Sequence, residues 1–413
     1  MAANKRGWLM VLVCFLTLVF LFGSSYNTAS VFFSPLLKTF GWSRARVSSL
    51  ATVLALAAGG SVPAIGWLLD RIEARLMMTA GALLILGGFI LASQARSYHT
   101  MVTAYTLLGL GVAAGTLLPC SLVIANWFDA QLGLAMGLTM SGTALGGTLM
   151  APICSRVIAT TGWRAGYLVL AAPILVLVIP LVLLTIDTPS LSSGASPSVR
   201  PERLGEGLEI GEALRSRSLW LIAATQLLWA FAVTAVNLHM VPVLIGQGLN
   251  AMRAATILSL VLALSACGKL VLGLIADRAG GRWALAGGLL AMAVGSAALG
   301  GARHGLWLNS FILFYGLSCG APLVLIPVVI TESLGRKRYG SLAGFVGIFH
   351  TTGAALGPLA MGYLFDLHGS YTLGLLSCVA ALSLGALLLP GARSLAQGAE
   401  MERVLATPNR SAI

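Results

Sequence analysis

Charged side chains are scarce in this chain. Asp, Glu, Lys and Arg make up 9% of its 413 residues, whereas roughly 25% is usual in soluble domains. So few charges cannot cover the surface of a water-soluble fold, which excludes a cytosolic enzyme. Apolar residues take their place. They form 58% of the chain and occur in repeated runs of about 20, the length at which a helix crosses a bilayer.

Several signatures of chemistry are also absent. The six cysteines lie inside apolar runs without pairing or metal-ligand spacing, so neither a disulfide nor a metal site is expected. They are Cys14, Cys120, Cys154, Cys267, Cys319 and Cys378. No nucleotide motif or nucleophile constellation appears, so we expect neither an enzyme nor a cofactor. Loop charge in a membrane protein explains most of the excess of 25 basic over 13 acidic residues, and no nucleic-acid partner is expected.

Twelve apolar runs are separated by charged or turn-rich breaks. They lie near residues 8–34, 47–69, 76–95, 100–126, 132–157, 165–186, 218–245, 254–276, 283–301, 306–332, 340–365 and 371–390. The first run carries no small-residue cleavage site in a suitable place, so we interpret it as a retained helix and not as a signal peptide. The predicted fold class is an all-α membrane protein with twelve transmembrane helices in a lipid bilayer.

The longest connection, residues 188–217, is rich in Ser, Pro, Gly and charge, which is typical of a mobile linker. It divides the chain into an N-terminal six-helix bundle (1–187), a cytoplasmic linker (188–217), a C-terminal six-helix bundle (218–392) and a cytoplasmic tail (393–413). Residues 206–217 form either a short amphipathic helix, with Leu208, Ile210 and Leu214 toward lipid, or a solvated tether.

The distribution of basic residues predicts the orientation. With the N-terminus inside, sixteen lysines and arginines fall on the cytoplasmic side and eight on the other. The positive-inside rule therefore places both termini in the cytoplasm. Compact loops and short tails suit a bacterial inner membrane.

Two motifs of the first half recur in the second. Residues 66–71 match residues 273–278 at an offset of 207, and residues 142–147 match residues 353–358 at an offset of 211. Offsets that nearly agree are what two parallel, pseudo-symmetric six-helix repeats produce.

These motifs resemble the major facilitator superfamily across the whole chain. Gly66, Leu68, Asp70, Arg71 and Arg75 are similar to its signature between the second and third helices, with Glu73 where glycine is usual. Gly273, Asp277, Arg278, Gly280, Gly281 and Arg282 form the second copy.

A cytoplasmic gate is the functional interpretation of the two copies. Asp70, Arg71 and Arg75, with Asp277, Arg278 and Arg282, are expected to pair across helix ends and hold the bundles together in the outward-open state. The alternative is that the arginines merely decorate the positive-inside face.

Three further stretches resemble the monocarboxylate transporter branch of the superfamily and its bacterial relatives. They are Trp127-Phe128 with Gly133–Gly137, then Glu212–Ser216, and Gly357-Pro358 with Gly362–Asp366 and Gly369–Tyr371. This resemblance implies a carrier for small monocarboxylates.

Lys269 is the informative charge within a span. It precedes Asp277 by eight residues, roughly 12 Å along a helix, while the hydrocarbon half-thickness is roughly 15 Å. Near the midplane, an unpaired lysine is expected to face a watery cavity and a counter-anion. The carboxylates Asp70, Asp277, Glu332 and Asp366 all map to helix ends. The missing anion is most simply the substrate, and a snorkelling lysine is the alternative.

The resemblance adds a role for this position. Monocarboxylate transporters carry an arginine here that binds the carboxylate, and Lys269 keeps the charge but loses the bidentate geometry. The family's coupling aspartate falls at Ser265, and the lysine of its first helix has no counterpart. Proton symport would therefore use Lys269 or His350 as the titrating group.

Other candidate substrate contacts are polar side chains within spans. Asn27 and Tyr26, in the first run, either bind a carboxylate or hydroxyl or bond neighbouring backbone. His350 either accepts a proton or is a structural histidine, and Tyr315 either lines the cavity or packs.

We therefore expect a secondary active transporter that moves a small organic anion by alternating access. The leading substrate is a monocarboxylate such as lactate or pyruvate, with protons as the co-transported ion. An organic anion exchanger and a multidrug efflux carrier are alternatives, although efflux carriers usually have intramembrane carboxylates. A non-transporting membrane sensor is the alternative of another class.

Overall fold

A computed structural model describes residues 2–42, 44–128, 130–186 and 207–392, apart from a few side chains. This part of the chain is helical, with one isolated backbone bridge between Gly207 and Gly335. Within these ranges, eleven segments are long and apolar enough to cross a membrane, and one pair of helices bent by 42°, taken as one span, makes a twelfth. The predicted all-α fold of twelve spans is confirmed.

The first group of helices comprises α1 (Ala2–Thr17), η1 (Leu18–Asn27), η2 (Ala29–Phe32), α2 (Phe33–Phe40), α3 (Arg44–Leu69), α4 (Ala74–Gln94), α5 (Tyr98–Gly115), α6 (Leu117–Trp127), α7 (Leu132–Thr161), α8 (Trp163–Pro173), η3 (Ile174–Val178) and α9 (Ile179–Thr185). The second comprises α11 (Ile210–Arg215), α12 (Arg217–Gly246), α13 (Ala251–Ala279), α14 (Gly281–Leu299), α15 (Gly305–Ser310), η4 (Phe311–Tyr315), α16 (Gly316–Ser318), α17 (Pro322–Leu334), α18 (Tyr339–His368), α19 (Thr372–Leu388) and η5 (Leu389–Gly391).

The first span is shorter than predicted. Its apolar segment runs from Lys5 to Tyr26, whereas the sequence pattern predicted residues 8–34. The polar stretch that begins at Ser24 interrupts the run, and the chain continues into the separate helix α2. Gly41 ends α2 in the left-handed conformation, with φ of 64°.

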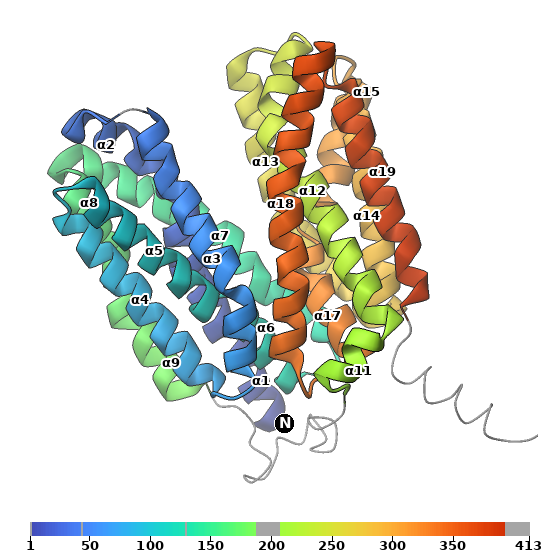
Figure 1. Ribbon diagram of the computed structural model, residues 1–413, viewed down its shortest axis with the longest axis horizontal. Coiled ribbons are helices and arrows are strands. Elements are labelled where there is room, and N and C mark those ends of the chain that lie inside the picture. Colours follow the sequence, from blue (N-terminus) through green and yellow to red (C-terminus); the bar gives the residue numbers. More distant parts are fainter. Residues whose placement is uncertain (1, 43, 129, 187–206, 393–413) are drawn as a thin grey trace, which may run out of the picture.

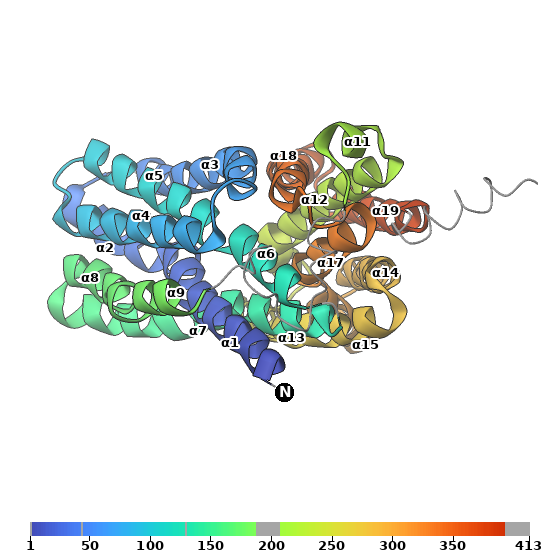
Figure 2. The same cartoon turned by 90° about the horizontal axis from the view of Figure 1, so that it is seen from below.

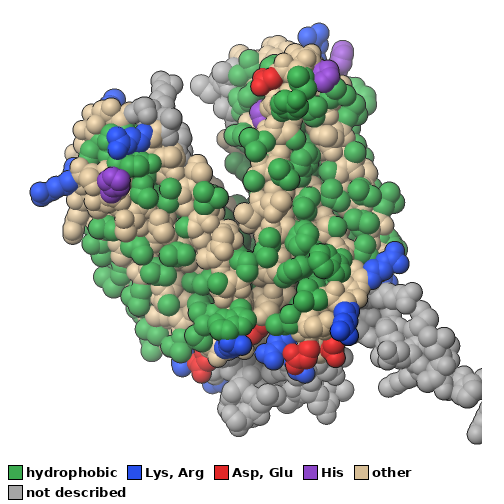
Figure 3. Space-filling view, viewed as in Figure 1, with side chains coloured by type: hydrophobic (Ala, Val, Ile, Leu, Met, Phe, Trp, Pro, Cys, Tyr) green, Lys and Arg blue, Asp and Glu red, His purple; other side chains and the backbone are tan. Residues whose placement is uncertain are grey.

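The helices form two bundles that meet at one end of the molecule and splay apart at the other (Figure 1). The N-terminus lies at the end where they meet. Figure 3 shows a hollow between the bundles that widens toward the opposite end. We call these the closed end and the open end. Seen from below, α3 lies beside α18 and α7 beside α13 (Figure 2).

Glycine pairs bring the bundles together in two seams, one between α3 and α18 and one between α7 and α13. An ideal Cβ on Gly66 would lie 2.2 Å from the carbonyl oxygen of Gly340, and one on Gly133 would lie 2.1 Å from that of Gly273. Side chains at these positions would force the backbones apart. Gly273 follows Gly66, and Gly340 follows Gly133, by 207 residues, so the seams are equivalent in the repeat.

A second pair of glycines on α7 and on α18 packs inside each bundle. Gly146 of α7 approaches the backbone of Val19, and Gly357 of α18 approaches that of Phe231 in α12. These two glycines are 211 residues apart. Both sequence offsets therefore correspond to equivalent helix contacts in the two halves of the chain. The stretch between the seam glycine and the intra-bundle glycine is four residues longer in α18 than in α7. Four residues are about one helical turn, so both contacts stay on the required faces of the helix.

Candidate functional site

Lys269 lies on α13 in the α7–α13 seam, further from the closed end than Gly273 and Asp277. Lys269 is 3% exposed. Its Nζ donates to Thr143 Oγ1 at 2.9 Å and to the carbonyl of Met140 at 3.3 Å. Both acceptors belong to α7 of the other bundle. The predicted cavity-facing position of Lys269 is therefore wrong for this conformation. The close approach of α7, where Gly137 meets the Lys269 carbonyl, explains the burial.

The contacts of Lys269 leave its charge uncompensated. An ammonium has three donors, and its two acceptors here, a hydroxyl and a carbonyl, are both neutral. Within the described ranges, no carboxylate forms an ion pair with Lys269. A buried cation with dipolar partners alone is a strong attractor for an anion.

The broken span formed by α15 to α17 passes directly beside Lys269. Its break lies between Ser318 and Pro322, where a proline suits the first turn of a new helix. An ideal Cβ on Gly320 would lie 2.7 Å from Lys269 Cε and 2.3 Å from Ser265 Oγ. Sequence reasoning missed Gly320. The signal for it was the Gly-Ala-Pro triplet in the middle of an apolar run.

His350 lies on α18 and contacts Trp229 of α12, with ring centroids 5.3 Å apart. The Trp229 indole donates to the carbonyl of Cys319, in the break beside Lys269, at 3.3 Å. The His350 Nδ1 is buried and has no hydrogen-bond partner in the described structure. Trp229 and Cys319 thus lie between the two titratable candidates, His350 and Lys269.

The other candidates lie in different settings. Tyr315 is fully buried, and its hydroxyl donates to Asn237 Oδ1 at 2.9 Å, which favours the packing alternative. Tyr26 is 37% exposed and stacks on Phe22. The side chain of Asn27 lies outside the described residues.

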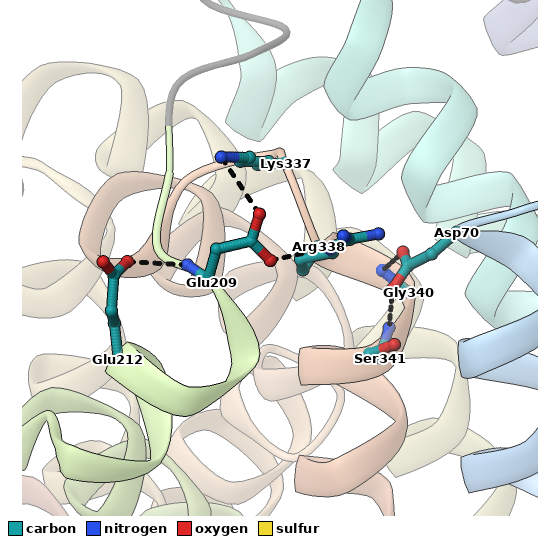
Figure 4. A network of polar contacts seen from close by, with 7 residues as sticks. All are labelled: Asp70, Glu209, Glu212, Lys337, Arg338, Gly340 and Ser341. Carbon is teal, nitrogen blue, oxygen red and sulfur yellow. Dashed lines mark hydrogen bonds and ion pairs between the residues drawn. The ribbon is translucent and has the colours of Figure 1, made fainter.

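Two aspartates connect the bundles at the closed end. Asp70 accepts hydrogen bonds from the backbone N–H groups of Gly340 and Ser341 at 2.8 and 3.0 Å (Figure 4). Asp277 accepts from Gly133 and Leu134 at 2.6 and 2.9 Å. These N–H groups belong to the first turns of α18 and α7, which lack intrahelical acceptors and favour negative charge. Each carboxylate therefore caps a helix of the other bundle.

The predicted pairing of aspartates with arginines differs from the observed contacts. Arg71 stacks on Trp67, with its Cζ 3.6 Å from the ring centroid, and Arg75 pairs with Glu73 at 3.2 Å. Arg282 donates to the carbonyl of Ala392 in its own bundle at 3.2 Å. The two carboxylates accept hydrogen bonds from helix N-termini, whose N–H groups lie directly opposite across the seams. Among the residues that the structure describes, Arg278 forms no ion pair with either aspartate.

Sequence reasoning missed two further contacts between the bundles. Arg336 donates to the carbonyl of Phe128 at 2.9 Å, and the Tyr339 hydroxyl donates to Ser121 Oγ at 3.0 Å. Arg336 is one of the sixteen basic residues on the predicted cytoplasmic side. No spacing rule points to a partner more than two hundred residues away.

The segment before α12 packs against the loop that leads into α18. Leu208 donates its N–H to the carbonyl of Leu334 at 3.0 Å, and Glu209 binds Lys337 at 3.0 Å and Arg338 at 2.9 Å (Figure 4). Hydrogen bonds from Arg338 and Lys337 hold the pKa of Glu209 below its usual value. We call residues 207–215 the strap.

The strap agrees in part with the predicted amphipathic helix. Helix α11 begins with a capping box of Glu209 and Glu212, and Ile210 and Leu214 are 38% and 42% exposed. Leu208 differs from its prediction, because it packs against the protein core and not toward lipid.

Comparison with known proteins agrees with this architecture. The family model of the Major Facilitator Superfamily matches residues 14–358 and, overlapping them, 248–408. The chain belongs to this superfamily. It is 24% identical over 400 residues to an uncharacterized superfamily-type transporter, YcxA of Bacillus subtilis (strain 168), covering 93% of this chain and 94% of YcxA. It is 25% identical over 418 residues to monocarboxylate transporter 12 of Rattus norvegicus, covering 93% and 84%.

A solved structure has the same superfamily fold. The proton:xylose symporter XylE superimposes with a TM-score of 0.76 at 15% identity, covering 96% of this chain and 99% of XylE. The predicted resemblance to the superfamily and to its monocarboxylate branch is confirmed. The chain is thus a multi-pass membrane transporter.

Proposed function

We propose that this superfamily member carries a small organic anion, most directly a monocarboxylate such as lactate or pyruvate, across a bacterial inner membrane by alternating access with proton symport. The observation that carries the proposal is the buried Lys269 ammonium, which has no carboxylate partner among the described residues. Isolated charge in a low-dielectric site is unfavourable. A bound carboxylate relieves that penalty.

The relatives support the same substrate class. Rat monocarboxylate transporter 12 matches along nearly the whole chain. Substrate contacts are assigned to Lys269, to His350 behind Trp229, and to Tyr26 and Asn27 of the first span. Tyr315 is buried and bonded to Asn237, so it is assigned a packing role.

The conformation fits an outward-open carrier. Under the positive-inside assignment, the closed end and both termini are cytoplasmic, and the hollow in Figure 3 opens to the outside. Bundles 1–187 and 218–392 then rock about the site, with 188–217 as linker and 393–413 as tail. The inner gate consists of Asp70 and Asp277 with their capped helices, flanked by Arg71, Arg75, Arg278 and Arg282.

Proton coupling is assigned to Lys269 and His350. A protonated Lys269 binds the anion in the outward-open state. Once the anion has left, loss of the proton removes the charge that is unfavourable to bury, so the empty site returns without it. One proton then moves with each carboxylate.

Uptake by proteoliposomes tests the proposal. Radiolabelled lactate and pyruvate are added with and without an inward proton gradient. We expect gradient-stimulated uptake that falls in Lys269→Ala by roughly thirtyfold, equivalent to about 2 kcal/mol for a hydrogen bond to a charged group. Lys38→Ala removes an exposed lysine and is the matched control. Uptake that is equal in wild type and Lys269→Ala would contradict the role of Lys269.

A further inference from the structure

The two seams are equivalent in the repeat but differ in chemistry at one point. Lys269 follows Val62, and Gly347 follows Met140, by 207 residues. In the α3–α18 seam, an ideal Cβ on Gly347 would lie 2.6 Å from Val62 Cγ1, so the contact is apolar. In the α7–α13 seam, the Lys269 ammonium binds the Met140 carbonyl and Thr143. One seam is thus closed at its top by a charged hydrogen bond and the other by a methyl group.

We propose that Thr143 is a positioning residue that holds Lys269 against α7 while the site is empty, and that the incoming anion takes the ammonium from it. This inference rests on the proposed function, because it requires an anionic substrate. Loss of the Lys269–Thr143 bond releases the top of one seam. Substrate binding is thereby linked to separation of the bundles at the closed end.

The geometry orients the Thr143 hydroxyl for this role. Its hydrogen is donated to the Met140 carbonyl at 2.7 Å, so the oxygen presents a lone pair to Lys269 at 2.9 Å. The β-branched side chain has few rotamers in a helix. Met140 accepts from both partners, and the three groups form a closed triangle across the seam.

An anion outcompetes this triangle. Thr143 and Met140 offer only dipoles to the ammonium, whereas a carboxylate offers a full negative charge, and the attraction between opposite charges is strong where water is excluded. The triangle lies further along α7 from the closed end than the Asp277 contacts, so a ligand that enters from the open end reaches this part of the seam before it reaches Asp277. The bonds of Asp277 to α7, further down, then hold this seam with less support.

Distances between spin labels test the inference without any need for a transported substrate. Labels replace Leu76 on α4 and Leu214 on α11, which are 52% and 42% exposed near the closed end of different bundles. The background is Cys267→Ser, because Cys267 is an exposed cysteine and the other five are buried. Thr143→Val removes the hydroxyl and keeps the shape.

We expect the apo Thr143→Val protein to show a long-distance population increased about tenfold over wild type, the equivalent of one tethering hydrogen bond. Thr143→Ser restores the closed distance, because it keeps the hydroxyl. Thr148→Val is the matched control, since the Thr148 hydroxyl donates only to its own helix, at Ala144. Lactate is the probe ligand, and it lengthens the distance in wild type but not further in Thr143→Val.

The outcomes separate the two proposals. Apo distance distributions that are identical in wild type and Thr143→Val overturn the inference, whatever the transport result. An open Thr143→Val with rescue by Thr143→Ser supports the tether. In that case, if wild type neither takes up nor responds to lactate or pyruvate, the proposed substrate is overturned and the tether stands.

Discussion

At the scale of single residues, the space around the Lys269 side chain limits which residues can lie beside the proposed substrate site. Its stem and the Ser265 hydroxyl, on the same helix, both lie against Gly320 in the break of a span. A residue larger than glycine at position 320 does not fit beside the lysine stem. An added methyl group at position 320 should therefore disturb the proposed site, as removal of the charge does.

Gly320→Ala tests this packing. The added Cβ would lie 2.3 Å from Ser265 Oγ and 2.7 Å from Lys269 Cε, so we expect displacement of Lys269 and uptake reduced by about tenfold or more, with overpacking that destabilises the fold by about 1–3 kcal/mol. Radiotracer uptake and thermal melting measure the two effects. Gly287→Ala, which meets nothing within 4 Å, is the control. Equal uptake by both variants would show that the stem has room to move.

Sequence reasoning reached Lys269 but not its partners. The position of a lysine within an apolar run, eight residues from a helix-end aspartate, is a local pattern. Its contact with Thr143 joins residues 126 positions apart, and it arises only because glycines let α7 and α13 approach. The same reason explains why Arg336 was missed and why the predicted arginine partners of Asp70 and Asp277 differ from the observed backbone N–H groups.

At the scale of elements, two carboxylates cap helices of the opposite bundle. Asp70 and Asp277 lie at the ends of α3 and α13, where the helix dipole disfavours negative charge. The first turns of α18 and α7 carry the partial positive charge of a helix N-terminus, which favours the carboxylates. Each aspartate is thus stable at its helix end only while the bundles are together at this end.

Asp70→Asn and Asp277→Asn should each loosen the closed end. The amide keeps one acceptor oxygen and loses the charge, so we expect a longer distance between labels at positions 76 and 214 and a larger effect in the double variant. Loss of a charged capping interaction corresponds to about 1 kcal/mol, roughly a fivefold change in population. Asp366→Asn, an exposed aspartate of α18, should leave the distance unchanged. A change as large in that control would mean that surface charge alone affects the equilibrium.

The strap forms a further contact at the closed end, between Glu209 and the residues Lys337 and Arg338, and we expect this contact to be sensitive to acid. Because Lys337 and Arg338 lower the pKa of Glu209, its contribution is fully present above the ordinary glutamate range and is lost as the pH falls through the lowered value. We expect hydrogen exchange of residues 335–338 to increase in strong acid and, at neutral pH, in Glu209→Gln. Glu73→Gln, which breaks the Glu73–Arg75 pair within one bundle, is the control. Equal exchange in wild type and Glu209→Gln at neutral pH would contradict the role of this pair.

At the scale of the whole molecule, the twelve-span architecture was predictable from the sequence, but which end of the two bundles is closed was not. Apolar runs of bilayer length mark the spans because lipid requires them. The sequence repeat likewise predicted two related bundles. Whether the bundles meet at one end or the other depends on hydrogen bonds between residues such as Asp70 and Gly340, far apart in the chain. The first span was overestimated because polar residues from Ser24 onward end it early.

Thiol labelling in intact cells tests the orientation. In the Cys267→Ser background, Glu73→Cys reports on the closed end and His304→Cys on the open end, where both native side chains are exposed. The positive-inside rule predicts that a membrane-impermeant maleimide modifies position 304 and spares position 73 until the cells are permeabilised. The reverse pattern would mean that the closed end faces outward.

The capping of helices by Asp70 and Asp277 also limits what mutational scanning can find. Their partners are backbone N–H groups, which every residue except proline supplies. Replacing the side chains of Ser341 or Leu134 leaves these bonds intact, so a scan for suppressors will recover the two aspartates and report no partner for either. Side-chain mutagenesis therefore detects only the aspartate half of the proposed gate, and proline or an altered backbone at positions 134 and 341 is needed to detect the N–H half.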